Sequence, residues 1–293
     1  MIKLKDVLDF ILATKDNEVL VEINDAVKDK FKTNSSYLKC KLMPGDKVRI
    51  NGSGKIEKGY EALFCKIKEN YQNSSRVFLI DGFNGLDWSQ FRKSLNRLFS
   101  NDGFEVTWEK IDSYQLPEKN IKDLIEPFLG EDDPLWGSHY PFGMESFFDP
   151  LKISKLRIQA AKNKNNNSIL IIYGCGSGIL DIYDCLIYLD IPKDILQENA
   201  RKNKVTNIGS KESLKFVQFY KRSYFIDWPA QNRKKRELLP DIDILVDLSD
   251  PLFPVIISGD DFRATLSLLS QTPFRPRPWF YPGPWGGKFM QGH

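Results

Sequence analysis

The 293-residue sequence contains little histidine, little cysteine and almost no net charge. Its two histidines, His139 and His293, and four cysteines without a Cys-x-x-Cys pair exclude a Cys/His zinc site built from this chain alone. The 42 Lys plus Arg against 39 Asp plus Glu leave a net charge of +3, too little to predict nucleic-acid binding from overall charge. We expect free thiols and not disulfides, and no nucleic-acid partner.

Long hydrophobic runs are also missing. No run approaches the ~20 apolar residues that a membrane span needs, and the N-terminus lacks the apolar core and cleavage site of a signal peptide. The composition, 41% hydrophobic and 28% charged, is sufficient for one large core or two modest ones. These features predict a globular cytoplasmic protein with no membrane partner.

The composition changes twice along the chain. Residues 1–70 have short strand-like segments and a polar, Lys-rich connection, which predict a small α+β or β-rich appendage. Residues 71–270 alternate apolar strands with helical patterns. Residues 271–293 concentrate proline and large aromatic residues, a composition that needs a partner surface.

The middle region predicts an α/β fold. Continuous apolar runs at 77–80, 168–173 and 185–189, together with a further strand at 104–108, alternate with helical apolar patterns such as that of 151–161. Such strands are typical of a mainly parallel sheet with helices on both faces. Because ligands bind beyond the carboxyl ends of parallel strands, we expect the chemistry in the loops that follow them.

The loop after the first of these strands lies where a phosphate-binding P-loop is expected. Gly82 fits the first glycine of G-x-x-x-x-G-K-[ST] and Ser89 fits its hydroxyl, but Asp87 replaces the second glycine and Trp88 replaces the lysine. Asp87 followed by Gln90 is also typical of a helix N-cap, which satisfies the amides that a phosphate would need. The loop is a self-capped turn or, as the alternative, a retained phosphate or nucleotide site.

Two other glycine-rich loops and two acidic stretches give weaker signals. Residues 52–55 (GSGK) lack the rest of the P-loop pattern and predict a turn. Residues 174–178 (GCGSG) follow a strand without a clear following helix, so we expect a strand-end turn, with a dinucleotide contact as the alternative. Acidic residues at 131–133 and 241–250 have no pairing partners, so we expect solvated carboxylates and no metal site.

Residues 220–236 interleave cations with aromatic side chains. The spacing of four between Phe216, Tyr220 and Tyr224 predicts the core face of a helix, with the cations on its solvated side. The alternative is a surface for a sugar phosphate or a protein partner that includes Arg222 and Arg233.

Several segments resemble known families. Residues 277–290 (RPWFYPGPWGGKFM) resemble the segment that opens the cupin part of class I mannose-6-phosphate isomerase-like proteins. Residues 128–137 and 220–240 look like stretches of the long N-terminal region of two-part members of that group. Residues 81–95 and 169–201 are similar to the P-loop, later strand, glycine turn, strand and lid of uridine kinase-like proteins.

The resemblance implies a P-loop kinase-like domain joined through residues 271–293 to a cupin half that this chain does not include. It implies interconversion of mannose 6-phosphate and fructose 6-phosphate in the parent protein, with zinc in the missing half. This chain would then be a non-catalytic accessory domain without a cofactor of its own. A uridine kinase-like small-molecule kinase with an atypical P-loop and a phospho-ligand binding module are the alternatives.

The candidate contacts form two groups, and no residue is assigned a catalytic role. The candidates for phosphate or nucleotide binding are Asp81, Gly82, Gly85, Ser89 and Arg201. The candidates for a sugar phosphate or partner are Arg222, Arg233, Trp285, Gly286 and Gly287.

Overall fold

A computed structural model of the chain describes residues 18–20, 49–51, 56–131, 133, 136–165 and 167–271. The junction expected after residue 271, with Trp285, Gly286 and Gly287, lies outside the described residues. Of the expected N-terminal appendage, two short strands are described, β1 (Glu18–Leu20) and β2 (Arg49–Asn51), and they pair antiparallel.

A seven-stranded sheet with the order β3-β9-β8-β7-β4-β6-β5 forms the centre of the fold. Its strands are β3 (Glu57–Lys58), β4 (Val77–Gly82), β5 (Val106–Lys110), β6 (Ile169–Tyr173), β7 (Cys185–Asp190), β8 (Ile244–Asp247) and β9 (Val255–Ser258). The strands β5, β6, β4, β7 and β8 are parallel to one another, and β9 and β3 extend the sheet in antiparallel pairs. The mainly parallel α/β class is confirmed.

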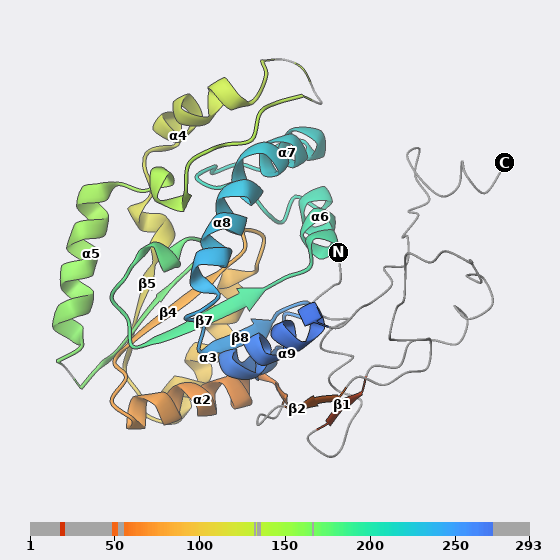
Figure 1. The fold of residues 1–293 in the computed structure, drawn as a ribbon. Helices are drawn as coiled ribbons and strands as arrows, with labels where there is room; N and C mark the ends of the chain where they lie inside the picture. Colours follow the sequence, from red (N-terminus) through yellow and green to blue (C-terminus); the bar gives the residue numbers. More distant parts are fainter. Residues whose placement is uncertain are drawn as a thin grey trace, which may run out of the picture.

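Helices cover both faces of the sheet (Figure 1). The α-helices are α2 (Tyr60–Gln72), α3 (Trp88–Asn101), α4 (Glu118–Ile125), α5 (Pro150–Asn163), α6 (Lys193–Arg201), α7 (Phe216–Arg222), α8 (Trp228–Leu238) and α9 (Gly259–Gln271). Short 3-10 turns are η2 (Ile111–Tyr114), η3 (Glu126–Phe128), η4 (Met144–Phe147) and η5 (Ser177–Ile179), and a π-helical turn, η6 (Ser223–Asp227), joins α7 to α8.

The order of the parallel strands places β4 at the point where the chain changes direction across the sheet. The chain first builds β5 and β6 on one side of β4 and then β7 and β8 on the other. Ligands of open α/β sheets bind beyond the carboxyl ends of the strands at such a switch point. This arrangement is consistent with a P-loop kinase-like α/β fold, and it makes the end of β4 the first place to look for a site.

The core strands form where the sequence is continuously apolar. Every residue of β4, β6 and β7 is buried, as expected for central strands covered on both faces. The expected strand at 104–108 begins two residues later, at Val106, because the Phe104 amide donates to Phe99 O and closes the end of α3. The Phe104 ring then packs edge-on against Phe64 and Phe99.

Two further observations qualify the sequence predictions. The sheet takes in β3, which lies before the expected boundary at residue 71, while the division into domains stays a prediction. The predicted core face of the helix near residue 220, which included Tyr220 and Tyr224, is wrong, because these side chains are 37% and 46% exposed. Phe219 and Ile226 are buried instead. Tyr220 is already exposed within α7, and the π-helical turn that follows lengthens the helical period, so the spacing of four does not continue along one face at Tyr224.

Candidate functional site

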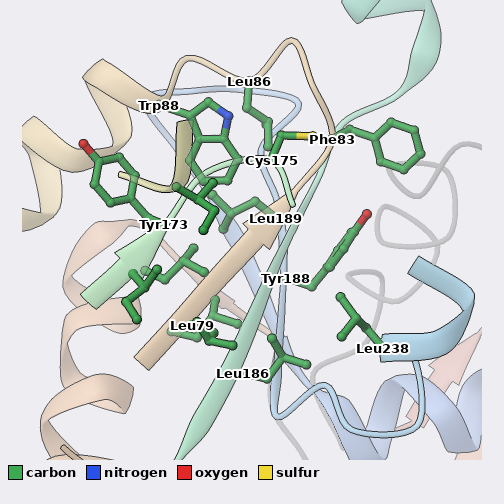
Figure 2. Packing of buried hydrophobic residues seen from close by; sticks show 14 of the residues in the cluster. Leu79, Phe83, Leu86, Trp88, Tyr173, Cys175, Leu186, Tyr188, Leu189 and Leu238 are labelled. Carbon is green, nitrogen blue, oxygen red and sulfur yellow. The ribbon is translucent and has the colours of Figure 1, made fainter. Parts of the chain in front are cut away.

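The turn between β4 and α3 is closed by its own residues. The Asp87 carboxylate accepts a hydrogen bond from the Gln90 amide, with Oδ1 at 2.9 Å from the nitrogen, so the predicted N-cap is confirmed. Trp88, at the place of the P-loop lysine, is only 9% exposed and packs against Tyr173, with ring centroids 6.2 Å apart. Figure 2 shows its indole beside Tyr173 and Leu86 within the apolar cluster.

The two glycines of this turn leave no room for a side chain. A Cβ on Gly82 would lie 2.6 Å from Leu189 O of β7. Gly85 has a φ of +108°, and a Cβ there would lie 2.8 Å from Leu196 of α6. Both glycines therefore serve close packing of the turn against β7 and α6. Ser89, in the first turn of α3, is exposed.

The side chain of Asp81, which lies in β4, reaches into the loop that follows β6. Its side chain is 3% exposed, and its carboxylate accepts hydrogen bonds from the amides of Gly82, Gly176 and Gly178 at 2.7, 2.8 and 3.0 Å. Successive amides of this kind form a concave site for an anion, and here the anion belongs to the protein. A Cβ on Gly178 would lie 2.6 Å from Asp81 Oδ2, which explains the glycine. The predicted strand-end turn is confirmed.

Burial and hydrogen bonding shift the pKa of Asp81 in opposite directions. Burial, the largest effect, raises the pKa of its carboxyl from 3.8 to about 6, although the three amides and the nearby Lys234 favour the ionised form. A buried carboxyl that titrates near pH 6 at a switch point is a feature of functional sites. Its hydrogen bonds also stabilise the fold, since they join β4 to the loop after β6.

Helix α8 lies across the carboxyl edge of the sheet. Gln231 Oε1 accepts from the Asn84 amide at 3.0 Å, which ties α8 to the β4–α3 turn. Lys234 forms ion pairs with Glu145 and with Glu237. Burial lowers the pKa of Lys234, but these two carboxylates raise it by more, so its pKa is raised overall. The first part of the sheet edge, at β4 and β6, is thus filled by groups of the protein.

A pair of lysines lies next to this edge, at the end of β7. Lys235 of α8 forms an ion pair with Asp190, with Nζ at 2.7 Å from Oδ2. Lys193, the first residue of α6, lies with its ammonium 5.4 Å from the Phe83 ring centroid, and the Lys235 ammonium lies 5.7 Å from the same centroid. Burial first and Lys235 second lower the pKa of Lys193. The sequence analysis did not predict this pair. The available signal was Asp190 at the end of an apolar strand, followed after one residue by Pro192 and Lys193.

The predicted arginine contacts do not come together at this edge. Arg222 is 8% exposed and donates to Ile208 O and Ser210 Oγ, and its Nε lies 3.7 Å from Asp227 Oδ1. Arg233 donates to the carbonyls of Tyr140 and Phe142. Arg201, in the last turn of α6, is exposed and lies over the Phe216 ring at 4.2 Å. The guanidinium groups of Arg222 and Arg233 thus hold segments of the fold together.

Thiol and acidic side chains provide no metal centre in the described part of the chain. Cys65, Cys175 and Cys185 are free thiols, and burial raises the pKa of the last two. Among the described residues, no group of three or more His, Cys, Asp and Glu side chains is placed to hold a metal ion. Within the same residues, none of the helices combines the length and apolar character needed to cross a bilayer.

The comparisons with known proteins yield one family and one distantly similar structure. A crystal structure described as "putative fructose transport system kinase from Silicibacter sp. TM1040" is similar at 17% identity and a TM-score of 0.41, covering 60% of this chain and 94% of the other. No curated protein matches the sequence. The profile of a family described as "Domain of unknown function (DUF8485)" matches residues 59–271, which include the whole seven-stranded sheet except β3. The chain belongs to this DUF8485 family.

Proposed function

We propose that this chain is a kinase-like domain that binds a small anionic ligand and does not transfer a phosphoryl group at its β4–α3 turn. The observation against phosphoryl transfer is the Asp81 carboxylate, held by the amides of Gly82, Gly176 and Gly178. A carboxylate at this place satisfies amides that would otherwise be free for an anionic ligand, and it repels a phosphate electrostatically. The two neighbouring lysines at the end of β7, Lys193 and Lys235, support the anionic ligand.

The chemistry of the turn supports the same proposal. Phosphoryl transfer relies on cations that neutralise charge on the transferred group. Here Trp88 stands where a P-loop has its lysine, and Asp87 adds a negative charge at the start of α3 and caps the helix. Both changes weaken the affinity of the turn for a nucleoside triphosphate.

A finer assignment rests on sequence resemblance. Residues 277–290 resemble the entry of the cupin half of mannose-6-phosphate isomerase-like proteins, which supports an accessory role in a two-part isomerase whose cupin half holds zinc. Those residues lie outside the described part of the chain. Reading the parent gene past the codon for His293 tests this role, since a following cupin sequence would support it.

Calorimetry with ATP and magnesium tests the main proposal. We expect no binding heat at micromolar ATP, because the turn is capped and lacks its cation. Ser89→Ala serves as the matched variant, since Ser89 is the exposed hydroxyl at the magnesium position of the pattern. Micromolar affinity that disappears in Ser89→Ala would overturn the proposal and favour a kinase with an unorthodox P-loop.

A further inference from the structure

Lys193 is a half-buried cation that forms no ion pair within the described part of the chain. Its ammonium lies 5.0 Å from the Trp228 ring centroid and 5.4 Å from that of Phe83, but within the described residues no carboxylate lies at ion-pair distance from it and no acceptor at hydrogen-bond distance. Burial and the neighbouring Lys235 lower its pKa more than the nearby Asp190 raises it, so the charged form is held at a cost. Perturbed pKa values of this kind are concentrated at functional sites.

Lys235 supplies a second ammonium beside the same ring. It lies 5.7 Å from the Phe83 centroid and 5.2 Å from the Tyr188 centroid, and it gives one hydrogen bond to Asp190. Because an ammonium has several N–H donors, this bond leaves others available. The two lysines thus present unused donors close to the Phe83 ring.

The N-terminus of α6 adds a positive end to the same place. Pro192 is the N-cap of this nine-residue helix, and its side chain gives the first backbone amides no acceptor. The β4–α3 turn fits between α6 and α8: a Cβ on Gly85 would lie 2.8 Å from Leu196, and Asn84 donates to Gln231. The start of α6, the inner side of α8 and the turn therefore meet.

An unpartnered donor on α8 is a second, independent sign of a ligand. Gln231 is 4% exposed, its Oε1 is bonded to the Asn84 amide, and its Nε2 has no hydrogen-bond partner among the described residues. Gln231 lies one helical turn before Lys235 and contacts the turn that carries Phe83. A buried amide donor of this kind normally has an acceptor, either protein or ligand.

The nearby carboxylates limit the charge that the site can accept. Asp190 neutralises one of the two lysines, and Asp247, its neighbour at the end of β8, accepts from the amide and hydroxyl of Ser249. Asp194 lies in the first turn of α6. With one lysine neutralised, the pair suits a single phosphate group better than a polyphosphate chain or a nucleic-acid backbone.

We propose that Lys193, Lys235 and the N-terminus of α6 bind the phosphate group of a small phosphate monoester at the carboxyl end of β7. This inference rests on the proposed function, which requires a ligand site away from the closed β4–α3 turn. The rings of Phe83, Tyr188 and Trp228 lie beside the half-buried ammonium groups and reduce the water around them, which strengthens their attraction for an anion.

Calorimetry with two probes, inorganic phosphate and mannose 6-phosphate, tests the site on the full chain. We expect mannose 6-phosphate to bind more tightly than inorganic phosphate, because the proposed ligand is an ester. Equal binding would show that the site takes free phosphate and would overturn the assignment to a monoester. Lys193→Gln should weaken binding by about tenfold or more, since a charge-assisted hydrogen bond is lost. The matched control is Lys202→Gln, which removes the same charge from an exposed position at the end of α6 and should leave the affinity unchanged.

Thermal unfolding without ligand supplies a second readout. Lys193→Gln should leave the midpoint equal or raise it, because the variant removes a half-buried charge that forms no ion pair in the described part of the chain. Binding of neither probe at millimolar concentration, or equal losses in Lys193→Gln and Lys202→Gln, would overturn the site. ATP binding lost in Ser89→Ala would instead overturn the proposed function, so the two failures are distinguishable.

Discussion

Asp81 carries a negative charge to the buried end of the central strand. Its three amide partners compensate for part of the lost hydration, yet burial still raises its pKa from 3.8 to about 6. Because the folded pKa lies above the unfolded one, the folded state binds more protons between these values. The free energy of unfolding should therefore fall as pH rises from about 4 to about 6, by about 3 kcal/mol in total.

Asp81→Asn tests this balance. The amide group can accept from Gly82 and Gly176 but presents N–H to the Gly178 amide, so we expect a loss of about 1–3 kcal/mol at neutral pH. The variant should also lose the fall in stability between about pH 4 and about pH 6. Urea unfolding at several pH values measures both effects. Asp181→Asn, at an exposed ion pair, is the control and should keep the wild-type pH profile.

At the residue scale, the sequence predicted the Asp87 N-cap of α3. It did not predict that Asp81 binds the amides of the glycine-rich loop at 174–178. Asp87 and Gln90 are three positions apart, so local spacing alone predicts their hydrogen bond. Asp81 and Gly178 are 97 positions apart, and only the sheet brings them together. The Lys193 and Lys235 pair was missed for the same reason, since its two members come from different helices.

Among the elements, α3 depends on its first turn. The Asp87 carboxylate is the side-chain acceptor at the N-terminus of this 14-residue helix, and the buried face of α3 carries Trp88, Phe91, Leu95 and Phe99. A helix whose apolar face is packed keeps its position when the cap is lost, but it loses the free energy of that hydrogen bond.

Asp87→Ala should lower the free energy of unfolding by about 0.5–2 kcal/mol. Asp87→Asn keeps an acceptor oxygen and should cost much less, which separates the hydrogen bond from the charge. Chemical denaturation at neutral pH measures both variants. Equal losses in the two would show that the charge at the helix end, and not the cap, carries the effect.

The elements predicted correctly were those with a continuous apolar pattern. The strands β4, β6 and β7 were predicted within one or two residues because their side chains are buried on both faces. The π-helical turn at Ser223–Asp227 was not predicted; buried Arg222 and Asp227, five positions apart, lie at its two ends. The expected core face was wrong there, because Tyr220 and Tyr224 are exposed while Phe219 and Ile226 are buried.

At the scale of the whole molecule, the sheet is most protected at its centre. The strands β4, β6 and β7 are neighbours in the sheet, and every one of their residues is buried. The edge strand β5 alternates between half-buried and exposed residues, and the other edge, β3, has two residues. Local opening should therefore begin at the edges.

Hydrogen exchange followed by mass spectrometry tests this order. We expect peptides from β4, β6 and β7 to exchange only through global unfolding, and peptides from β5 to exchange at least about tenfold faster. Exchange at one uniform rate in central and edge strands would contradict the expectation and show that the sheet opens as one cooperative unit.

The pairing of Asp81 with Gly178 also constrains how this sequence can change over generations. Any side chain at position 178 would meet Asp81 Oδ2 at 2.6 Å, while loss of the carboxylate would leave the amides of Gly176 and Gly178 without their acceptor. The two positions are therefore epistatic, because the fitness cost of a substitution at one depends on the residue at the other. A Cβ at position 178 would also clash with Leu238 Cδ1, so a change at position 81 alone does not open position 178 to a side chain.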